Sequence, residues 1–235
     1  MVEPVDIRSR RRDWTRAEIV AAAWQLVARE GIAALSLREL AAMVGMRAPS
    51  LYTYFPSKNN LYDAMYAQGM REFAERMSNA PPGRNARETL RNLARTFVGT
   101  AAEDPFRYQL LFQRPIPGFV PSAESLAVGL AGLAATRKAA EAAGLRGQRA
   151  FDLFMATVRG LAGVQIANEP GGDRWVRLVD EAVGILVAHY ASSGQSVPTA
   201  SSATGPLAKR PSTMTAGDMG TEQKEDPHER PPTDA

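Results

Sequence analysis

The chain has 235 residues, 45% of them apolar and 23% charged, with a net charge of +3, as is ordinary for a packed protein of one or two domains. It contains no cysteine, which excludes disulfides and thiolate metal sites and fits a reducing cytoplasm. No apolar run approaches the roughly 20 residues that cross a bilayer, so we expect a cytoplasmic protein with no membrane partner.

Positive charge is concentrated near the N-terminus. Residues 1–58 hold nine Lys and Arg against six Asp and Glu, whereas residues 192–235 hold four against six. Residues 1–14 are predicted to form a basic flexible arm that follows phosphates or enters a minor groove. The alternative interpretation is a solvated tail without a specific role, because such tails show the same concentration of positive charge. The arginines of this arm are Arg8, Arg10, Arg11 and Arg12.

The first helix is predicted to begin at Thr15. Thr15 and Glu18 have the spacing of a capping box, in which a hydroxyl and a carboxylate each accept a backbone amide bond. Apolar residues then recur at helical spacing from Ile19 to Val27, and Gly31 ends the helix. This helix is expected to pack behind the next two.

Residues 36–58, SLRELAAMVGMRAPSLYTYFPSK, predict two short helices joined by a tight turn. Ser36 caps the first helix, and Gly45 can adopt the left-handed conformation that ends it. Pro49 fits the first turn of the second helix, whose Leu51 and Phe55 lie on one buried side. A short helix pair of this kind, with small polar residues facing outward, is typical of a helix-turn-helix that enters a major groove.

Residues 15–65 resemble the DNA-binding domain of tetracycline-repressor-like (TetR family) regulators. The resemblance rests on TRAEIVAAAWQLVAREG, SLRELAAMVGM and LYTYFPSKNNLYDAM. It implies an all-α protein in which a helix-turn-helix domain, residues 15–60, precedes a helical ligand-binding and dimerisation domain, residues 61–191. The residues from Ser192 to Ala235 are too polar to bury a core and are predicted to be a disordered tail.

The resemblance also implies the DNA contacts. The residues expected at or near base edges are Arg38, Arg47, Ala48, Pro49 and Ser50, and those expected at phosphates are Thr15, Tyr52, Tyr54 and Lys58. Ala48 and Pro49 have no side-chain donors, so base reading should fall largely on Arg38, Arg47, Ser50 and Thr53. The two tyrosines could instead be packing aromatics, and Arg38 a solvated surface residue.

The rest of the chain is predicted to be helical. Helices are expected over 58–77, 85–103, 106–112, 123–143, 151–165 and 175–189, with breaks at NAPPGR (79–84) and PIPGFVPS (115–122). The last two helices are apolar round most of their surface. The resemblance assigns them to a dimer interface, although an internal core gives the same periodicity.

A ligand pocket is predicted in this second domain. Its aromatic and apolar residues would suit an apolar or aromatic effector, although each could equally be core. The predicted lining is Phe97, Tyr108, Phe112, Phe119, Phe154, Met155 and Trp175.

The function expected from these observations is a ligand-responsive homodimeric repressor that an effector releases from a palindromic operator. The alternative is a helical interaction protein that has lost sequence-specific DNA binding. An enzyme is not expected, because the chain has only two histidines and lacks a P-loop, an H-E-x-x-H motif and a nucleophile elbow. We also expect no cofactor and no metal.

Overall fold

The computed structural model describes residues 7–192 of the chain. Residues 1–6 of the expected arm lie outside the described residues, and so does the expected tail apart from Ser192. Within residues 7–192 every regular element is helical, which confirms the all-α class. In chain order the elements are α1 (Ile7–Glu30), the 3-10 turn η1 (Ile32–Ala34), α2 (Leu37–Met43), α3 (Ala48–Tyr54), α4 (Lys58–Ser78), α5 (Ala86–Glu103), α6 (Pro105–Phe112), α7 (Ala123–Ala142), α8 (Gln148–Asn168), the 3-10 turn η2 (Val176–Leu178) and α9 (Val179–Ser192).

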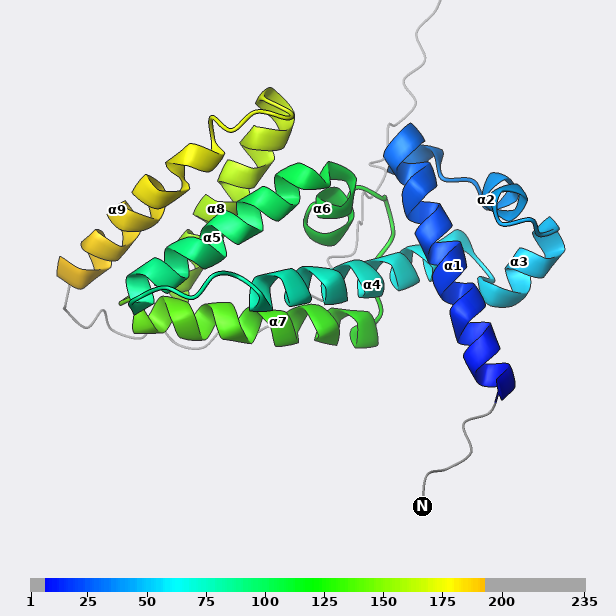
Figure 1. The fold of residues 1–235 in the computed structure, drawn as a ribbon, viewed down its shortest axis with the longest axis horizontal. Coiled ribbons are helices and arrows are strands. Elements are labelled where there is room, and N and C mark those ends of the chain that lie inside the picture. Colours follow the sequence, from blue (N-terminus) through cyan, green and yellow to red (C-terminus); the bar gives the residue numbers. More distant parts are fainter. Residues whose placement is uncertain (1–6, 193–235) are drawn as a thin grey trace, which may run out of the picture. The chain divides into compact units, whose positions relative to one another are not determined.

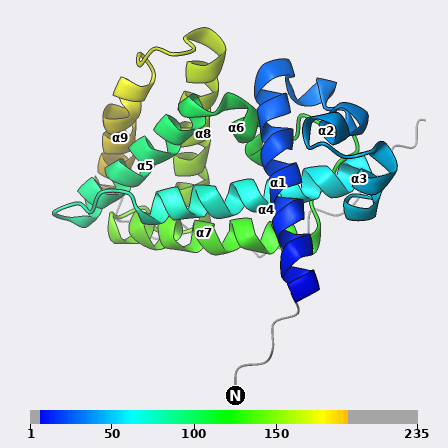
Figure 2. The ribbon, with the colours of Figure 1, turned by 45° about the vertical axis from the view of Figure 1, so that its right-hand side comes forward.

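Helix α4 connects the two ends of this arrangement. Figure 1 shows α2 and α3 beside α1 at one end, and α8 and α9 packed near α5 at the other. Helix α1 crosses α4, and α7 lies along α4 in the views of both Figure 1 and Figure 2. A shift of α4 would therefore reach both ends.

Helix α1 is longer at its N-terminus than predicted. It begins at Ile7, so residues 7–14 are helical rather than a flexible arm. Arginine is a good helix former, and α3 supplies carbonyl partners for this part of α1. Thr15, the predicted cap, lies inside the helix, where its hydroxyl donates to the Arg11 carbonyl at 3.0 Å. Threonine bonds the preceding turn in this way when it lies within a helix.

The helix-turn-helix forms where its local signals predict it. The Ser36 hydroxyl accepts a hydrogen bond from the Glu39 amide at 3.5 Å and caps α2. The Glu39 carboxylate does not complete the capping box; it pairs with Arg29 of α1 at 3.5 Å. Gly45 has φ of 68°, the left-handed conformation that lets the chain leave α2. Arg47 then takes the N-cap position of α3.

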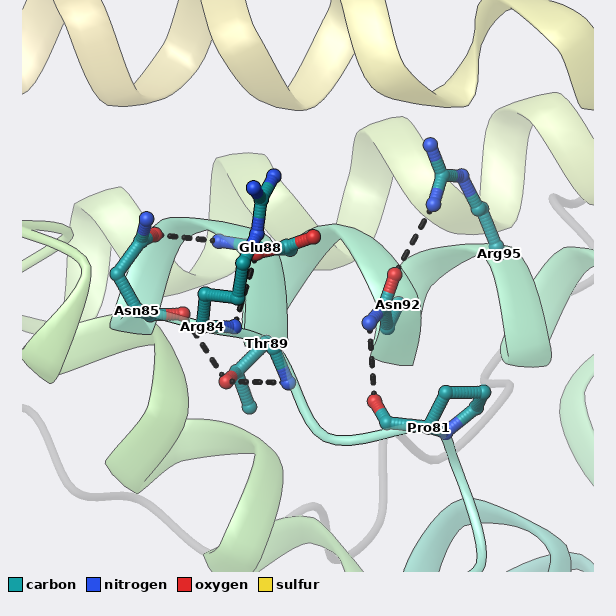
Figure 3. A network of polar contacts seen from close by, with 8 residues as sticks. Pro81, Arg84, Asn85, Glu88, Thr89, Asn92 and Arg95 are labelled. Carbon is teal, nitrogen blue, oxygen red and sulfur yellow. Dashed lines mark hydrogen bonds and ion pairs between the residues drawn. The ribbon is translucent and has the colours of Figure 1, made fainter.

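The turn between α4 and α5 is held by its own polar network (Figure 3). The Asn85 side chain accepts from the Glu88 amide at 3.0 Å and caps α5. The Glu88 carboxylate reaches back to the Arg84 amide at 2.8 Å and to its guanidinium at 2.9 Å. Gly83 is needed here, because a Cβ atom on it would lie 2.2 Å from the backbone nitrogen of Thr89.

The hydrophobic core consists of two clusters that share residues. The first lies among α1 to α4, but Leu110 of α6 and Phe119 of the following loop complete it. The second lies among α5, α7, α8 and α9. Phe73 of α4 and Phe112 of α6 pack against both clusters. The first core therefore continues past the domain boundary expected after residue 60.

Helix α7 turns its small residues toward α4. Cβ atoms on Gly129 and Gly132 would lie 3.3 and 3.2 Å from side-chain atoms of α4. Two leucines of α7 face outward, Leu126 at 40% and Leu130 at 66% exposure. Packing against α4 thus uses the glycine face of α7, because small residues allow close approach.

Helix α8 is long and apolar enough to cross a membrane by length and composition alone, with a mean hydropathy of 1.2. A core helix of a soluble protein passes the same test. In α8 one face, including Phe151, Phe154 and Val158, is buried in the second core. This packing favours the interpretation as a core helix.

Candidate nucleic-acid interface and adjoining cavity

The predicted DNA-contacting residues, with one exception, lie on the surface formed by α2, α3 and the start of α4. Ala48 and Tyr54 are half-buried in it, while Tyr52 is 49% exposed. Thr15 is the exception: it is buried in α1 at 9% exposure and its hydroxyl is already bonded. The exposed members of this surface, here called the reading surface, are Arg38, Arg47, Pro49, Ser50, Tyr52, Thr53 and Lys58.

Helix α3 is short but firmly held. Leu51 and Phe55 are fully buried beneath it. Its last carbonyls, which no residue of α3 itself can satisfy, accept hydrogen bonds from α1. Arg12 donates to the Thr53 carbonyl at 3.3 Å, and Arg16 donates to the Tyr54 carbonyl. A seven-residue helix would not persist alone, so these contacts fix the direction in which its outer face points.

The start of α4 places a cation beside α3. The Ser57 side chain accepts from the Asn60 amide at 3.2 Å and caps α4. Lys58 follows at the first position of α4 and is exposed, with its ammonium 6.0 Å from the centre of the Tyr62 ring. A helix N-terminus with an exposed lysine favours an anion such as a DNA phosphate.

A cavity of about 140 Å³ lies among α4, α5 and α6. Two of the predicted pocket residues, Tyr108 and Phe112, line it, and Phe97 contacts both rings from behind. The Tyr108 hydroxyl donates to the Arg159 carbonyl at 3.1 Å, and burial raises the pKa of Tyr108, so the phenol stays neutral. The full lining is Glu72, Phe73, Arg76, Thr100, Ala101, Asp104, Arg107, Tyr108, Leu111 and Phe112.

Arg107 connects this cavity to α1. Its guanidinium pairs with Glu72 of α4 and, at 3.1 Å, with Asp104 at the start of α6. It also lies over the ring of Trp24 in α1, 4.5 Å from the ring centre. Burial lowers the pKa of Arg107, yet a guanidinium remains protonated in proteins. The indole of Trp24 donates to Gln68 of α4 at 3.1 Å, so three helices meet at this point.

The other predicted pocket residues are dispersed. Phe119 packs against Tyr62 in the first core, 5.6 Å between ring centres. Phe154 is buried in the second core, and Met155 packs at its edge. Trp175 lies in the turn before α9, and its indole N–H is buried without a hydrogen-bond partner. The structure therefore brings together three of the seven predicted residues.

Sequence reasoning missed the charged residues of the cavity. Glu72 and Arg76 lie on α4 whereas Arg107 lies on α6, and charges of both signs along a helix such as α4 look like a solvated face. One signal was present. Arg107 is a lone cation in the apolar run FRYQLLF and follows Asp104 by three residues, a spacing that favours an ion pair.

The comparisons with known proteins agree with this geometry. Residues 19–65 match the family model described as bacterial regulatory proteins, tetR family. The TetR-family match thus falls on the helix-turn-helix end of the chain. Among the curated relatives, the TetR-like chain is 28% identical over 111 residues to the HTH-type transcriptional regulator Rv1816 of Mycobacterium tuberculosis, covering 46% of this chain and 47% of that protein.

A second relative is the HTH-type transcriptional repressor DrrR1 of Streptomyces coeruleorubidus. It is 35% identical over 109 residues, which cover 46% of this chain and 39% of that protein. The match thus spans about half the length of the curated relatives or less. Both relatives are named as regulators of transcription, which agrees with the expectation that this chain is not an enzyme.

Solved structures resemble a larger part of this chain than the curated relatives do. The regulatory protein SCO4313 is 26% identical with a TM-score of 0.63, over 78% of this chain and all of that one. The fatty acid degradation regulator FadR of Bacillus halodurans is 18% identical with a TM-score of 0.59, over 73% and 94% of the two chains. The second likeness concerns the fold alone.

Proposed function

We propose that this TetR-family protein is a cytoplasmic homodimeric repressor that binds a palindromic operator and is released from it by a small effector. The reading surface carries the proposal. It presents Arg47, Ser50 and Thr53 outward from α3, on a helix fixed by two buried residues and two arginine contacts. Side chains of these types recognise base edges in a major groove.

In this proposal residues 15–60 bind DNA, and residues 61–191 bind the effector and dimerise. Exposed apolar residues on α8 and around α9 support the dimer, among them Leu153, Leu178 and Ile185. A Cβ atom added to Gly160 would meet no other atom of this protomer within 4 Å, which leaves room for a neighbouring helix. Two copies of α3 about 34 Å apart would contact two half-sites, and an effector that changes this separation would release the DNA.

The proposed effector site is the cavity at Arg107. Three aromatic side chains, Phe73, Tyr108 and Phe112, suit an apolar or aromatic body. At about 140 Å³ the cavity is smaller than the roughly 300 Å³ typical of sites for drug-sized ligands. It therefore fits a small ligand, or a larger one that displaces α6.

The proposal is tested by selecting bound duplexes from random DNA with the full-length protein, at two salt concentrations. A palindromic motif whose half-site centres lie about ten base pairs apart, or a multiple of that, is the expected result. The mass of the complex, measured by light scattering, should then correspond to an even number of chains. Weak, salt-sensitive binding with no enriched motif would contradict the proposal and favour the interaction-protein alternative.

A further inference from the structure

The first half of α1 is an element of this chain that precedes the family match. The match begins at residue 19, whereas α1 begins at Ile7. The described residues before that point carry an unusual density of positive charge on an ordered helix. The arginines there are Arg8, Arg10, Arg11, Arg12 and Arg16.

Three of these arginines form a row along α1. Arg8, Arg12 and Arg16 follow one another at four-residue intervals and so share one face of the helix, about 6 Å apart along its axis. Arg12 and Arg16 are anchored to the carbonyls of Thr53 and Tyr54, so this face is turned toward the end of α3. The Arg16 guanidinium also lies 4.4 Å from the centre of the Phe55 ring.

A shallow groove accompanies the row. Its walls are Arg8, Arg11 and Arg12 on one side and Thr53 and Tyr54 on the other. Arg11 is exposed beside it. Like charges four residues apart oppose helix formation, and a bound polyanion would remove this repulsion. Arg8 and Arg11, three residues apart and both exposed, suit two neighbouring phosphates better than a single anion.

We propose that residues 7–16 form a preorganised helical arm that binds the sugar-phosphate backbone of the duplex read by α3. Arg8 and Arg11 contact phosphates next to the half-site, while Arg12 holds the arm against α3. This inference rests on the proposed function, because it assumes that α3 faces DNA. The contact between the arm and the phosphates does not distinguish bases, so it strengthens binding to every DNA sequence.

The test compares the full-length protein with the double variant Arg8→Ala/Arg11→Ala. Alanine preserves helix propensity, so the arm should remain folded. Binding to the wild-type-selected duplex and to a mixed-sequence duplex of about 40 base pairs, roughly four turns, is measured by fluorescence anisotropy over a range of salt concentrations. The control, Arg146→Ala/Arg149→Ala, removes the same charge from exposed positions in the turn before α8 and at its start.

The double variant should weaken binding to both duplexes by the same factor. The slope of log affinity against log salt should become shallower by about 0.9 for each phosphate that the variant no longer neutralises, and so by three to four for the two arms of a dimer. The selected motif should not change, the control should match wild type, and Arg8→Lys/Arg11→Lys should regain most of the slope. If wild type binds DNA and the double variant has the same salt slope, the proposed role of the arm is overturned and the proposed function is not. A wild type that binds neither duplex would overturn the proposed function with it.

Discussion

The reading surface and the Arg107 cavity are built in opposite ways. The exposed residues of the reading surface, from Arg38 to Lys58, come from one contiguous stretch of chain and face solvent. The cavity draws its lining from three helices, and its best-placed charge, Arg107, is paired with Glu72 and Asp104. The reading surface offers exposed polar side chains to a large partner, whereas the cavity holds its best-placed cation in ion pairs.

This difference indicates where regulation can enter. The reading surface is supported by α1 and by the first core, and that core includes Leu110 of α6. The cavity is lined by the same short helix, α6, whose Arg107 also touches Trp24 of α1. A ligand that moves α6 would therefore alter both the pairing of Arg107 and the support beneath the reading surface.

The largest effect is expected where the two regions share a core. Leu110→Ala should lower the free energy of unfolding by about 2–5 kcal/mol, because it leaves a cavity between α6 and the helices of the first core. Urea denaturation followed by circular dichroism measures this. Leu130→Ala, an exposed leucine on α7, is the control and should change it by less than about 0.5 kcal/mol. Equal effects would mean that α6 does not support the helix-turn-helix.

Within the reading surface, Arg47→Ala should relax base selectivity. Arg47 is exposed at the N-cap of α3, so its loss should cost about 1–3 kcal/mol of discrimination at one half-site position. The measurement is affinity for a set of duplexes that differ at single positions of the selected motif. Discrimination that stays unchanged at every position would remove Arg47 from the base contacts.

Lys58→Ala should behave differently from Arg47→Ala. Because Lys58 is assigned to a phosphate, its loss should weaken binding to all sequences by a similar factor and lessen the salt slope by about 1. Lys138→Ala, an exposed lysine on α7, serves as the control. If Lys58→Ala and Arg47→Ala had the same profile across sequences, the division into base and phosphate contacts would fail.

Arg107→Met tests whether the cavity communicates with α1. The variant keeps an apolar side chain over Trp24 but loses the cation, which should cost about 1 kcal/mol of stability and leave Glu72 and Asp104 without this partner. Operator affinity should change with it. Arg71→Met removes an exposed arginine from α4 and should leave both quantities near wild type. Identical operator affinity for Arg107→Met and wild type would separate the cavity from the reading surface.

The smallest effect is expected in the α4–α5 turn, which belongs to neither region. Hydrogen bonds from the side chain and the backbone of Arg84 lower the pKa of Glu88. The pKa of Glu88 is thus lower in the folded protein than in the unfolded chain. The pairing therefore stabilises the folded protein at pH values above the unfolded-state pKa of Glu88. This stabilisation is lost as the pH falls through the folded-state pKa. Melting temperatures of wild type and Glu88→Gln should therefore converge in acid. DNA affinity near neutral pH should not differ between them.

The sequence by itself determined the features that depend on neighbours along the chain. The Ser36 cap, the left-handed Gly45 and the buried Leu51 and Phe55 follow from spacing and from the conformational freedom of single residues. The cap at Asn85 is local in the same way. The helix-turn-helix and the family resemblance could both be predicted for this reason, and the all-α class followed from the same periodicity.

Tertiary structure alone decided how distant segments meet. It extended α1 to Ile7, because the otherwise unsatisfied carbonyls at the end of α3 accept hydrogen bonds from Arg12 and Arg16. It separated Phe119 from Phe112, which were predicted to share a pocket, and it placed Glu72 beside Arg107, a pair that was not predicted. A hydrophobic pattern specifies which face of a helix is buried but not which helix covers it, so the position of the cavity depends on packing that local spacing does not encode.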